Sequence, residues 1–390
     1  MEGAVEYKPF WMGWGLCFLV GLTGPGVMSF ACIEDLPAGS IFSQWGRETL
    51  ETIERDHRLA GGGYSEDQSR TEPAYAWGHS ILLLAYAQAA KADSVFCEKT
   101  ENLIDFLQSY WVQENGIGGY DCLPEGRKKV ERYYDDNAWI AMGLLDAYEA
   151  CRKKDFLEQA RKTIEFCLSG EAPQGGIWWR QEPASPGRGR NTCSTAPTAF
   201  ACLRYCELTK DTGFLETAQR LLQWLEKTLQ DEDGLFFDHI RQDGRIGRRK
   251  WSYNSAMPIR SWVRLYRLTG REEYLQKALR TALAARERWL DEKTGALHCE
   301  AMFAFTLIEA WVELAEVSGQ EEWMQRARKG MEYVYQQVRD KEGRYSKRWD
   351  RPNPEPIQEW KLLYPSAAAR GYWALAAAYK NKETNQSIRE

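Results

Sequence analysis

A glycine turn followed by bulky hydrophobic residues recurs six times along this chain of 390 residues. The copies start at Gly61, Gly118, Gly175, Gly234, Gly295 and Gly343. Successive copies are therefore 57, 57, 59, 61 and 48 residues apart. Such self-similarity indicates that one supersecondary unit is repeated and that neighbouring copies bury each other's apolar faces. The chain is predicted to fold as six similar units.

A second signature alternates with the glycine turn and predicts that each unit is a helical hairpin. It is a short polar turn followed by an aromatic residue that begins an apolar helical pattern. The aromatic members are Phe156, Phe214, Tyr274 and Trp323. After Phe156, apolar residues return at Ala160, Ile164 and Cys167, which is the spacing of one helix face.

The two signatures together predict twelve helices. Their ranges are 41–60, 73–90, 94–113, 134–152, 154–169, 192–209, 211–230, 253–269, 271–290, 299–318, 320–339 and 364–380. Hairpins that cannot each bury an apolar face bury all of them at once when they close into a ring. We therefore predict an all-α fold, an (α/α)6 toroid of six helical hairpins; an open α-solenoid is the alternative. The toroid is predicted to be a single domain over residues 41–382, followed by a polar tail at 383–390.

The even-numbered helices are predicted to form the inner ring. They are richer in small and apolar residues, as at 138–145 and 366–369, whereas the odd-numbered helices carry Glu, Gln, Arg and Lys. The first residues of each even-numbered helix then lie at one mouth of the ring, beside the long glycine–aromatic loops.

Two adjacent carboxylates, Asp135 and Asp136, open the fourth predicted helix. One interpretation is that Asp135, Asp136 or Asn137 caps the helix and the remaining acid is solvated. The flanking residues are Tyr133, Tyr134 and Trp139. Aromatic faces stack on the apolar faces of sugar rings, so this surrounding favours a carbohydrate site over a solvated cap.

The composition supports a carbohydrate ligand and excludes other classes. The chain has 17 Trp, 19 Tyr and 14 Phe, and its formal net charge of −5 argues against nucleic acid or an anionic membrane surface as a partner. The ten cysteines form no Cys-x-x-Cys pair. Cys151, Cys167, Cys202 and Cys206 fall in helical patterns, where free buried thiols are expected, so a reducing compartment is predicted. The four histidines have no zinc-site spacing, and no metal is expected.

Residues 1–40 are predicted to be an apolar segment and linker outside the folded domain. Residues 10–22 resemble the hydrophobic region of a signal peptide, and residues 29–31 before Cys32 fit a small-residue cleavage site. We therefore expect secretion or membrane anchoring through this segment. Translation from Met28 would instead give a cytoplasmic protein.

Three motifs carry a family resemblance. The sequences YDDNAW at 134–139, GIWW at 176–179 and WSYN at 251–254 resemble glycoside hydrolase family 76, the endo-α-1,6-mannanases, and the similarity spans about residues 41–380. The resemblance implies that Asp135 is the nucleophile and Asp136 the general acid/base of a retaining glycosidase. Neighbours at a helix start differ by about 100° around the axis. Their carboxyl groups can therefore reach the separation of about 5–5.5 Å that retention requires.

The resemblance also implies substrate-binding residues. Asp238 matches an acidic residue that holds the substrate sugar, and at least one of Trp178 and Trp179 is expected to be a sugar platform. Tyr253 and Asn254 begin the eighth predicted helix, although Asn254 alternatively caps it. The other candidates are Asp121, Tyr134 and Asn191. Cys193 and Thr195 depart from the family pattern.

The expected function is hydrolysis of α-1,6-mannosidic linkages within mannan chains by an endo-acting enzyme. The enzyme is expected to be a monomer and to need no cofactor. Transglycosylation on the same glycans is one alternative, because a retaining enzyme can pass its intermediate to another sugar. A sugar 2-epimerase would need paired histidines, and only His79 and His298 fall near even-numbered helices. A non-catalytic glycan-binding toroid is the third alternative.

Overall fold

The computed structural model describes residues 38–114, 116–126, 131–181, 188–353 and 356–389. Residues 1–37 of the predicted N-terminal segment, with the cleavage site and Met28, lie outside the described residues. No helix among the described residues combines the length and apolar character needed to cross a bilayer.

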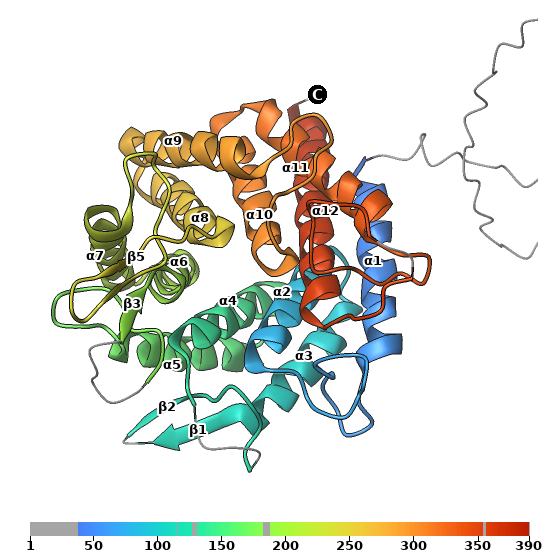
Figure 1. Ribbon diagram of the computed structural model, residues 1–390, viewed down its shortest axis with the longest axis horizontal. Helices are drawn as coiled ribbons and strands as arrows, with labels where there is room; N and C mark the ends of the chain where they lie inside the picture. The colour runs from blue at the N-terminus through green and yellow to red at the C-terminus, as the bar shows by residue number, and fades with distance from the viewer. Residues whose placement is uncertain (1–37, 115, 127–130, 182–187, 354–355, 390) are drawn as a thin grey trace, which may run out of the picture.

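Twelve α-helices in the described part of the chain form two concentric rings (Figure 1). The inner ring contains α2 (Ala76–Ala92), α4 (Tyr134–Cys151), α6 (Thr192–Thr209), α8 (Ser252–Thr269), α10 (Ala301–Ser318) and α12 (Leu363–Arg389). The outer ring contains α1 (Ala38–His57), α3 (Phe96–Leu107), α5 (Lys154–Ser169), α7 (Thr212–Leu229), α9 (Glu272–Trp289) and α11 (Glu321–Tyr333). The predicted all-α toroid, and the even-numbered inner ring, are confirmed.

The ring is closed by the two ends of the folded chain. Each inner helix packs against the next one, and α12 packs against α2. Five hairpins pair an inner helix with the outer helix that follows it, whereas α1 packs against α12. The open-solenoid alternative is therefore wrong, because an open array would leave α2 and α12 apart.

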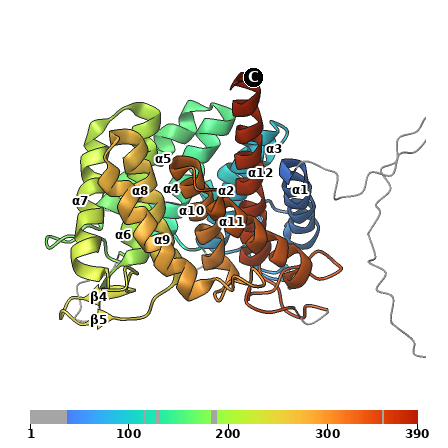
Figure 2. The ribbon, with the colours of Figure 1, turned by 90° about the horizontal axis from the view of Figure 1, so that it is seen from above.

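Four of the tight turns from an inner to an outer helix share one geometry. The residue after the inner helix is left-handed, with φ of 60° at Arg152, 66° at Lys210, and 68° at Gly270 and Gly319. Its N–H donates to the carbonyl four residues earlier and so ends the helix. These turns lie at one end of the barrel, and the long loops lie at the other (Figure 2).

Three helix ends differ from prediction by more than three residues. The eleventh predicted helix ends at Tyr333 rather than 339, because Val334–Val338 form a π-helical turn. The third helix ends at Leu107 rather than 113, because Gln108–Tyr110 form a 3-10 turn and β1 (Trp111–Glu114) pairs with β2 (Ile117–Tyr120). The last helix continues to Arg389, beyond the predicted end at 380 and through most of the predicted polar tail. No glycine or proline follows residue 380 to stop it.

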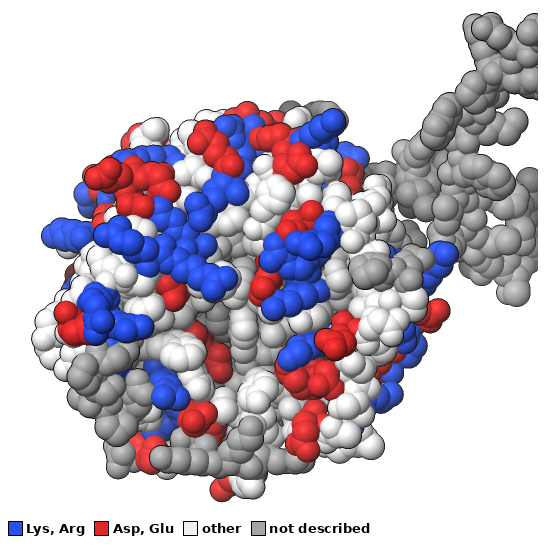
Figure 3. Space-filling model, in the orientation of Figure 1, with Lys and Arg blue, Asp and Glu red and all other residues white. Residues whose placement is uncertain are grey.

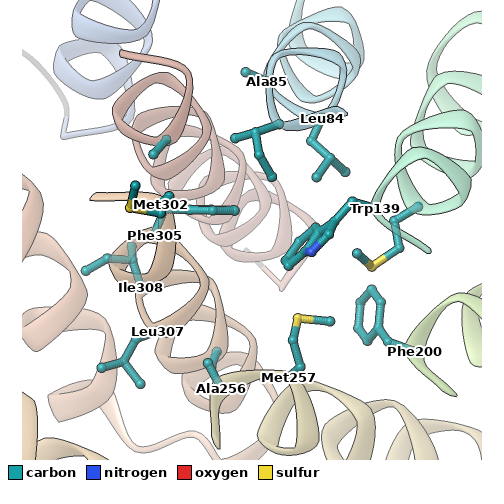
Figure 4. Packing of buried hydrophobic residues seen from close by; sticks show 14 of the residues in the cluster. Leu84, Ala85, Trp139, Phe200, Ala256, Met257, Met302, Phe305, Leu307 and Ile308 are labelled. Atoms are coloured by element: carbon teal, nitrogen blue, oxygen red, sulfur yellow. The ribbon is translucent and has the colours of Figure 1, made fainter. Parts of the chain in front are cut away.

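The axis of the barrel is filled by apolar side chains from the inner helices. Figure 4 shows Leu84, Trp139, Phe200, Met257 and Phe305 converging there. All are buried, and the rings of Trp139 and Phe305 are 5.9 Å apart. This plug separates the mouth of the barrel from a second cavity of about 400 Å³ at the opposite end.

A circle of ion pairs lines the second cavity and links the inner helices. The pairs that join neighbouring helices are Lys91–Asp146, Asp146–Arg204, Glu207–Arg264, Arg260–Glu309 and Glu309–Arg370. Arg370 completes the circle by donating to the Leu84 carbonyl of α2. Since these side chains are largely buried, removing one partner would leave an uncompensated charge.

One cysteine prediction is wrong. Cys151 is not a free thiol but forms a disulfide with Cys97. The last residue of α4 and the first turn of α3 meet only because α3 and α4 are neighbours in the ring, which a separation of 54 residues does not reveal. Six other described cysteines are free and buried. The inference of a reducing compartment loses the support of Cys151.

Candidate active site

The mouth of the barrel holds a cleft of about 1,270 Å³. Its walls come from the first turns of the inner helices and from the loops that precede them, as predicted from the repeat pattern. Lining residues include Trp77, Asp135, Asp136, Trp179, Asp238 and Tyr253. The axial residue Trp139 forms part of its floor.

The acid pair lies in the first turn of α4 without capping it. The N-cap position is Tyr133, which is extended and provides no side-chain cap. The helix start is held by backbone bonds instead, because Tyr134 N–H donates to the Trp179 carbonyl at 3.0 Å. The interpretation of Asp135, Asp136 or Asn137 as the N-cap is therefore wrong. Asn137 is buried and bonds to the backbone of Tyr120.

Asp135 is held as an anion by donors around it. Its Oδ2 accepts from Trp179 Nε1 at 3.0 Å, and its Oδ1 accepts from the Asp136 N–H at 3.1 Å. Burial raises the pKa of Asp135 to about 6, while hydrogen bonds from Trp179 and the Cys193 thiol act to lower it. At neutral pH this carboxylate is ionised and fixed in orientation.

Asp136 has the opposite environment. Burial raises its pKa well above the ordinary value, and the negative charges of Asp135 and Asp121 raise it further. No side chain in the described part of the chain donates a hydrogen bond to it. Two neighbouring carboxyl groups are thus separated into one anion and one protonated acid, which is the arrangement used in acid-assisted displacement at a sugar carbon.

A small sheet brings further polar residues to the cleft. β3 (Gly189–Asn191), β4 (His239–Arg241) and β5 (Ile246–Gly247) pair in antiparallel order, so that Asn191, His239 and Gly247 lie side by side. A Cβ on Gly247 would lie 2.3 Å from the His239 ring, so glycine is required for this packing. Asn191 and His239 both line the cleft.

Asp238 also lines the cleft and is held by two neighbours. Its Oδ2 lies 3.0 Å from His239 Nδ1, and Asn254 Nδ2 donates to its Oδ1 at 3.4 Å. Asn254 is buried beneath the wall, and Trp251 occupies the N-cap position of α8. Asn254 therefore positions Asp238 and neither caps α8 nor lines the cleft.

Trp178 and Trp179 lie in different environments, which agrees with the expectation that at least one of them is a sugar platform. Trp179 is 45% exposed in the cleft wall, with Tyr133 edge-on to its ring at 5.1 Å. Trp178 lies instead under the guanidinium groups of Arg188 and Arg190. Trp179 is thus the available platform for a sugar ring, and Trp178 packs behind it.

An aromatic wall stands on the side of α2, α8 and α10. Phe303 stacks on Tyr253 at 4.6 Å and contacts Trp251 at 5.0 Å and Trp77 at 6.0 Å. Tyr253 was predicted, but Trp77 and Phe303 were not. The signal that would have found them is their position, since each lies within the first three residues of an inner helix.

Two predicted substrate-binding residues lie beneath the cleft. The ring of Tyr134 is 3% exposed and stacks on Phe166, because α4 and α5 pack together there. The carboxylate of Asp121 accepts the backbone N–H groups of Cys122 and Glu131. The prediction of direct sugar contact is wrong for Tyr134, and Asp121 acts on the site through its charge near Asp136.

The histidines do not form the acid–base pair of an epimerase. His57 and His79 are buried, and burial lowers their pKa to about 4 and about 3. His298 is exposed outside the cleft lining. His239 is the one histidine among the described residues that line the cleft. No group of three or more described His, Cys, Asp or Glu side chains is placed to hold a metal ion.

Comparisons with known proteins agree with this geometry. The family model for glycosyl hydrolase family 76 matches residues 61–304. A GH76 α-mannanase structure from Bacteroides thetaiotaomicron is 32% identical, with a TM-score of 0.83 over 88% of this chain and 97% of that one. A second structure is an inactive variant of the α-1,6-mannanase GH76A of Salegentibacter sp. HEL1_6 in complex with α-1,6-mannotriose. It is 21% identical, with a TM-score of 0.75 over 86% of this chain and 99% of that one.

A curated sequence relative is more distant. The meiotically up-regulated gene 191 protein of Schizosaccharomyces pombe is 26% identical over 195 residues. The matched region covers 46% of this chain and 43% of that protein, so the chain spans less than half the length of this relative.

Proposed function

Because the chain belongs to glycosyl hydrolase family 76, we propose that it is a retaining hydrolase that cleaves α-1,6-mannosidic bonds within mannan chains. Glycoside hydrolysis follows from the family. The linkage, the stereochemistry and the internal point of attack are the proposal. The observation that carries it is the pair of adjacent carboxyl groups in opposite environments at the floor of the cleft.

In the first step, the Asp135 carboxylate attacks the anomeric carbon while Asp136 donates its proton to the glycosidic oxygen. The carbon–oxygen bond breaks, the shortened chain leaves as an alcohol, and a mannosyl ester forms on Asp135. Trp179 and Cys193 hold the attacking carboxylate in one orientation. The raised pKa of Asp136 keeps a proton available at neutral pH.

In the second step, Asp136 is a carboxylate and removes a proton from water, whose oxygen attacks the same anomeric carbon. The ester bond to Asp135 breaks, and two inversions give net retention. The two carboxyl groups belong to consecutive residues of one helical turn, which supports the short separation of a retaining enzyme. An inverting enzyme needs about 6.5–9.5 Å to hold a water between them.

The shape of the cleft supports an internal point of attack. Its volume exceeds the roughly 300–1,000 Å³ of ordinary small-ligand pockets, so it accommodates several sugar units. Trp179 on one side and Tyr253 on the other offer faces for different sugars. The α-1,6 linkage is supported by the mannotriose complex of the Salegentibacter enzyme, which has the same fold.

The test compares wild type with Asp135→Asn and Asp136→Asn on linear α-1,6-mannan, with NMR detection of the first anomer released. We expect short α-anomeric manno-oligosaccharides from wild type and a loss of about 10²–10⁴-fold in each variant. Asp136→Asn should still release dinitrophenol from an aryl α-mannoside, because that leaving group needs no proton, whereas Asp135→Asn should not. The control is Asp155→Asn, which changes an exposed first-turn aspartate of α5.

An inverted product would exclude retention. Intact mannan with wild type, together with measurable binding, would favour the glycan-binding alternative. Products longer than the starting mannan would indicate transglycosylation.

A further inference from the structure

The β4–β5 hairpin and the segment leading into α8 carry an unusual concentration of cations. Residues 239–250 contain four arginines and one lysine but a single aspartate, in a protein whose formal net charge is −5. Figure 3 shows these basic side chains gathered over β5 and the start of α8, at the margin of the central hollow. A neutral mannan provides no charge to meet them.

Three of these arginines, Arg241, Arg248 and Arg249, form what we call the arginine rim. All three are exposed, and among the described residues none of them forms an ion pair with a carboxylate. The nearby acids are already paired with other cations. Asp243 binds Arg245 at 2.6 Å, and Asp231 and Asp233 both bind Lys250. Asp243 and Asp231 act on Arg241 and Arg248 only through charge at longer range, so no carboxylate in the described part of the chain occupies the hydrogen-bond donors of the rim.

The rim is continuous with the candidate active site. Arg241 lines the same cleft as Asp135 and Asp136. It lies two residues after His239 on β4 and so shares the face that His239 presents to the cleft. Arg249 lies 3.8 Å above the ring of Trp251, which is itself part of the cleft wall. Both arginines are thereby held beside the path of a bound chain.

Arginine in this setting matches a phosphate group. The guanidinium presents a planar fork of donors that binds phosphate oxygens in pairs, and stacking on an aromatic ring leaves that fork free to do so. Two exposed arginines of the outer helices are instead paired along their helix, Arg161 with Glu165 and Arg328 with Glu332. The rim differs from these two in that its arginines have no carboxylate partner among the described residues and lie at the edge of a concave site.

We infer that the arginine rim binds phosphate groups carried by the glycan, so that the preferred substrate is a phosphorylated α-1,6-mannan. This inference rests on the proposed function, because the rim binds the phosphate while the mannan backbone lies across Asp135 and Asp136. A phosphorylated glycan is favoured over an anionic membrane because Arg241 lies in the wall of a cleft. A chain can follow that wall, whereas a flat bilayer cannot.

The experiment measures kcat/KM on three substrates at low salt. They are α-1,6-mannotetraose, the same tetraose with a phosphate on its non-reducing-end O6, and the tetraose with a phosphate on its reducing-end anomeric oxygen. We expect at least one phosphorylated substrate to be preferred by about tenfold, the size of one charge-assisted hydrogen bond at an exposed site. The preference should shrink at 0.5 M NaCl.

The double variant Arg241→Gln/Arg249→Gln should bring the ratio of phosphorylated to neutral kcat/KM close to one. The matched control Arg161→Gln/Arg328→Gln removes the same charge from outer helices and should keep the wild-type ratio. A ratio near one in wild type, with the neutral tetraose cleaved, would overturn the inference and leave the proposed function intact. Cleavage of none of the three would instead refute the proposed function.

A membrane role is separated by sedimentation with vesicles of phosphatidylserine and phosphatidylcholine. Loss of vesicle binding in the rim variant, with equal cleavage of all three substrates by wild type, would contradict the glycan inference. Absence of vesicle binding, with the phosphate preference present, would support it.

Discussion

Replacement of Trp179 by phenylalanine isolates one hydrogen bond to the proposed nucleophile. The indole Nε1 donates to Asp135 Oδ2 at 3.0 Å, and phenylalanine keeps an aromatic face but no donor. A hydrogen bond to a charged group contributes about 1.5–3 kcal/mol. Since Trp179 is 45% exposed, water replaces part of the bond, and we take the lower end. A change of one pKa unit corresponds to about 1.4 kcal/mol, so loss of this hydrogen bond should raise the pKa of Asp135 by about one.

The direction in which the pH profile shifts follows from the proposed role of Asp135 as the nucleophile. A nucleophile must be ionised, so kcat/KM falls as the pH drops through its pKa, which burial raises to about 6 in the wild type. With Trp179→Phe the anion is less stabilised, and the acidic limb should move upward to about pH 7. The alkaline limb reports the protonated Asp136 and should move less.

The assay is the initial rate of reducing-end release from α-1,6-mannan between pH 4 and pH 9. The matched control is Trp178→Phe, which changes the neighbouring indole that lies under Arg188. The control should leave the acidic limb in place. An acidic limb that stays fixed, or moves downward, in Trp179→Phe would refute the assignment of this hydrogen bond to the nucleophile.

Three further changes test the charges and the covalent link. Asp121→Asn removes a negative charge that raises the pKa of Asp136, so the alkaline limb of kcat/KM should move to lower pH. Asp146→Asn leaves the cations of the inner circle uncompensated and should cost about 3–5 kcal/mol in urea unfolding at pH 7. Because those cations lower the pKa of Asp146, this stability is present above its unfolded pKa of about 3.9 and is lost as the pH falls further. The difference from wild type should therefore shrink below about pH 4; a constant difference would argue against the ion pairs as its origin. Cys97→Ser opens a 54-residue loop and should lower the free energy of unfolding by about 4 kcal/mol on the chain-entropy account, with dithiothreitol reproducing the loss in wild type only.

The location of the proposed catalytic groups was partly predictable from local sequence patterns. The apolar spacing after Phe156 and the glycine turns predicted the helices, and the order of turns placed Asp135 and Asp136 at the mouth of the ring. The protonation states of the two carboxyl groups could not be predicted from local sequence patterns. The pKa of Asp136 depends on Asp121, which comes from the loop before α4, and on burial by the whole ring.

Side-chain direction was the main source of error around the cleft. Tyr134 and Asp135 are consecutive, yet one faces Phe166 and the other faces the cleft, because successive residues of a helix point about 100° apart. Trp178 and Trp179 diverge for a different reason, because successive side chains of an extended segment point to opposite faces. Sequence proximity to a motif therefore identified the right region but not which side chains reach the ligand.

The sequence by itself determined the number of helices, their approximate limits and the location of the acid pair, because helix periodicity and turn chemistry are encoded within a few residues. It favoured a closed ring over an open solenoid, and the contact of α12 with α2 decided between them. Tertiary structure decided the pairing of α1 with α12, the Cys97–Cys151 disulfide, and the aromatic wall around Phe303. It also decided which carboxyl group is an anion. These features depend on contacts between segments far apart in the chain, and those contacts exist only once the ring has closed.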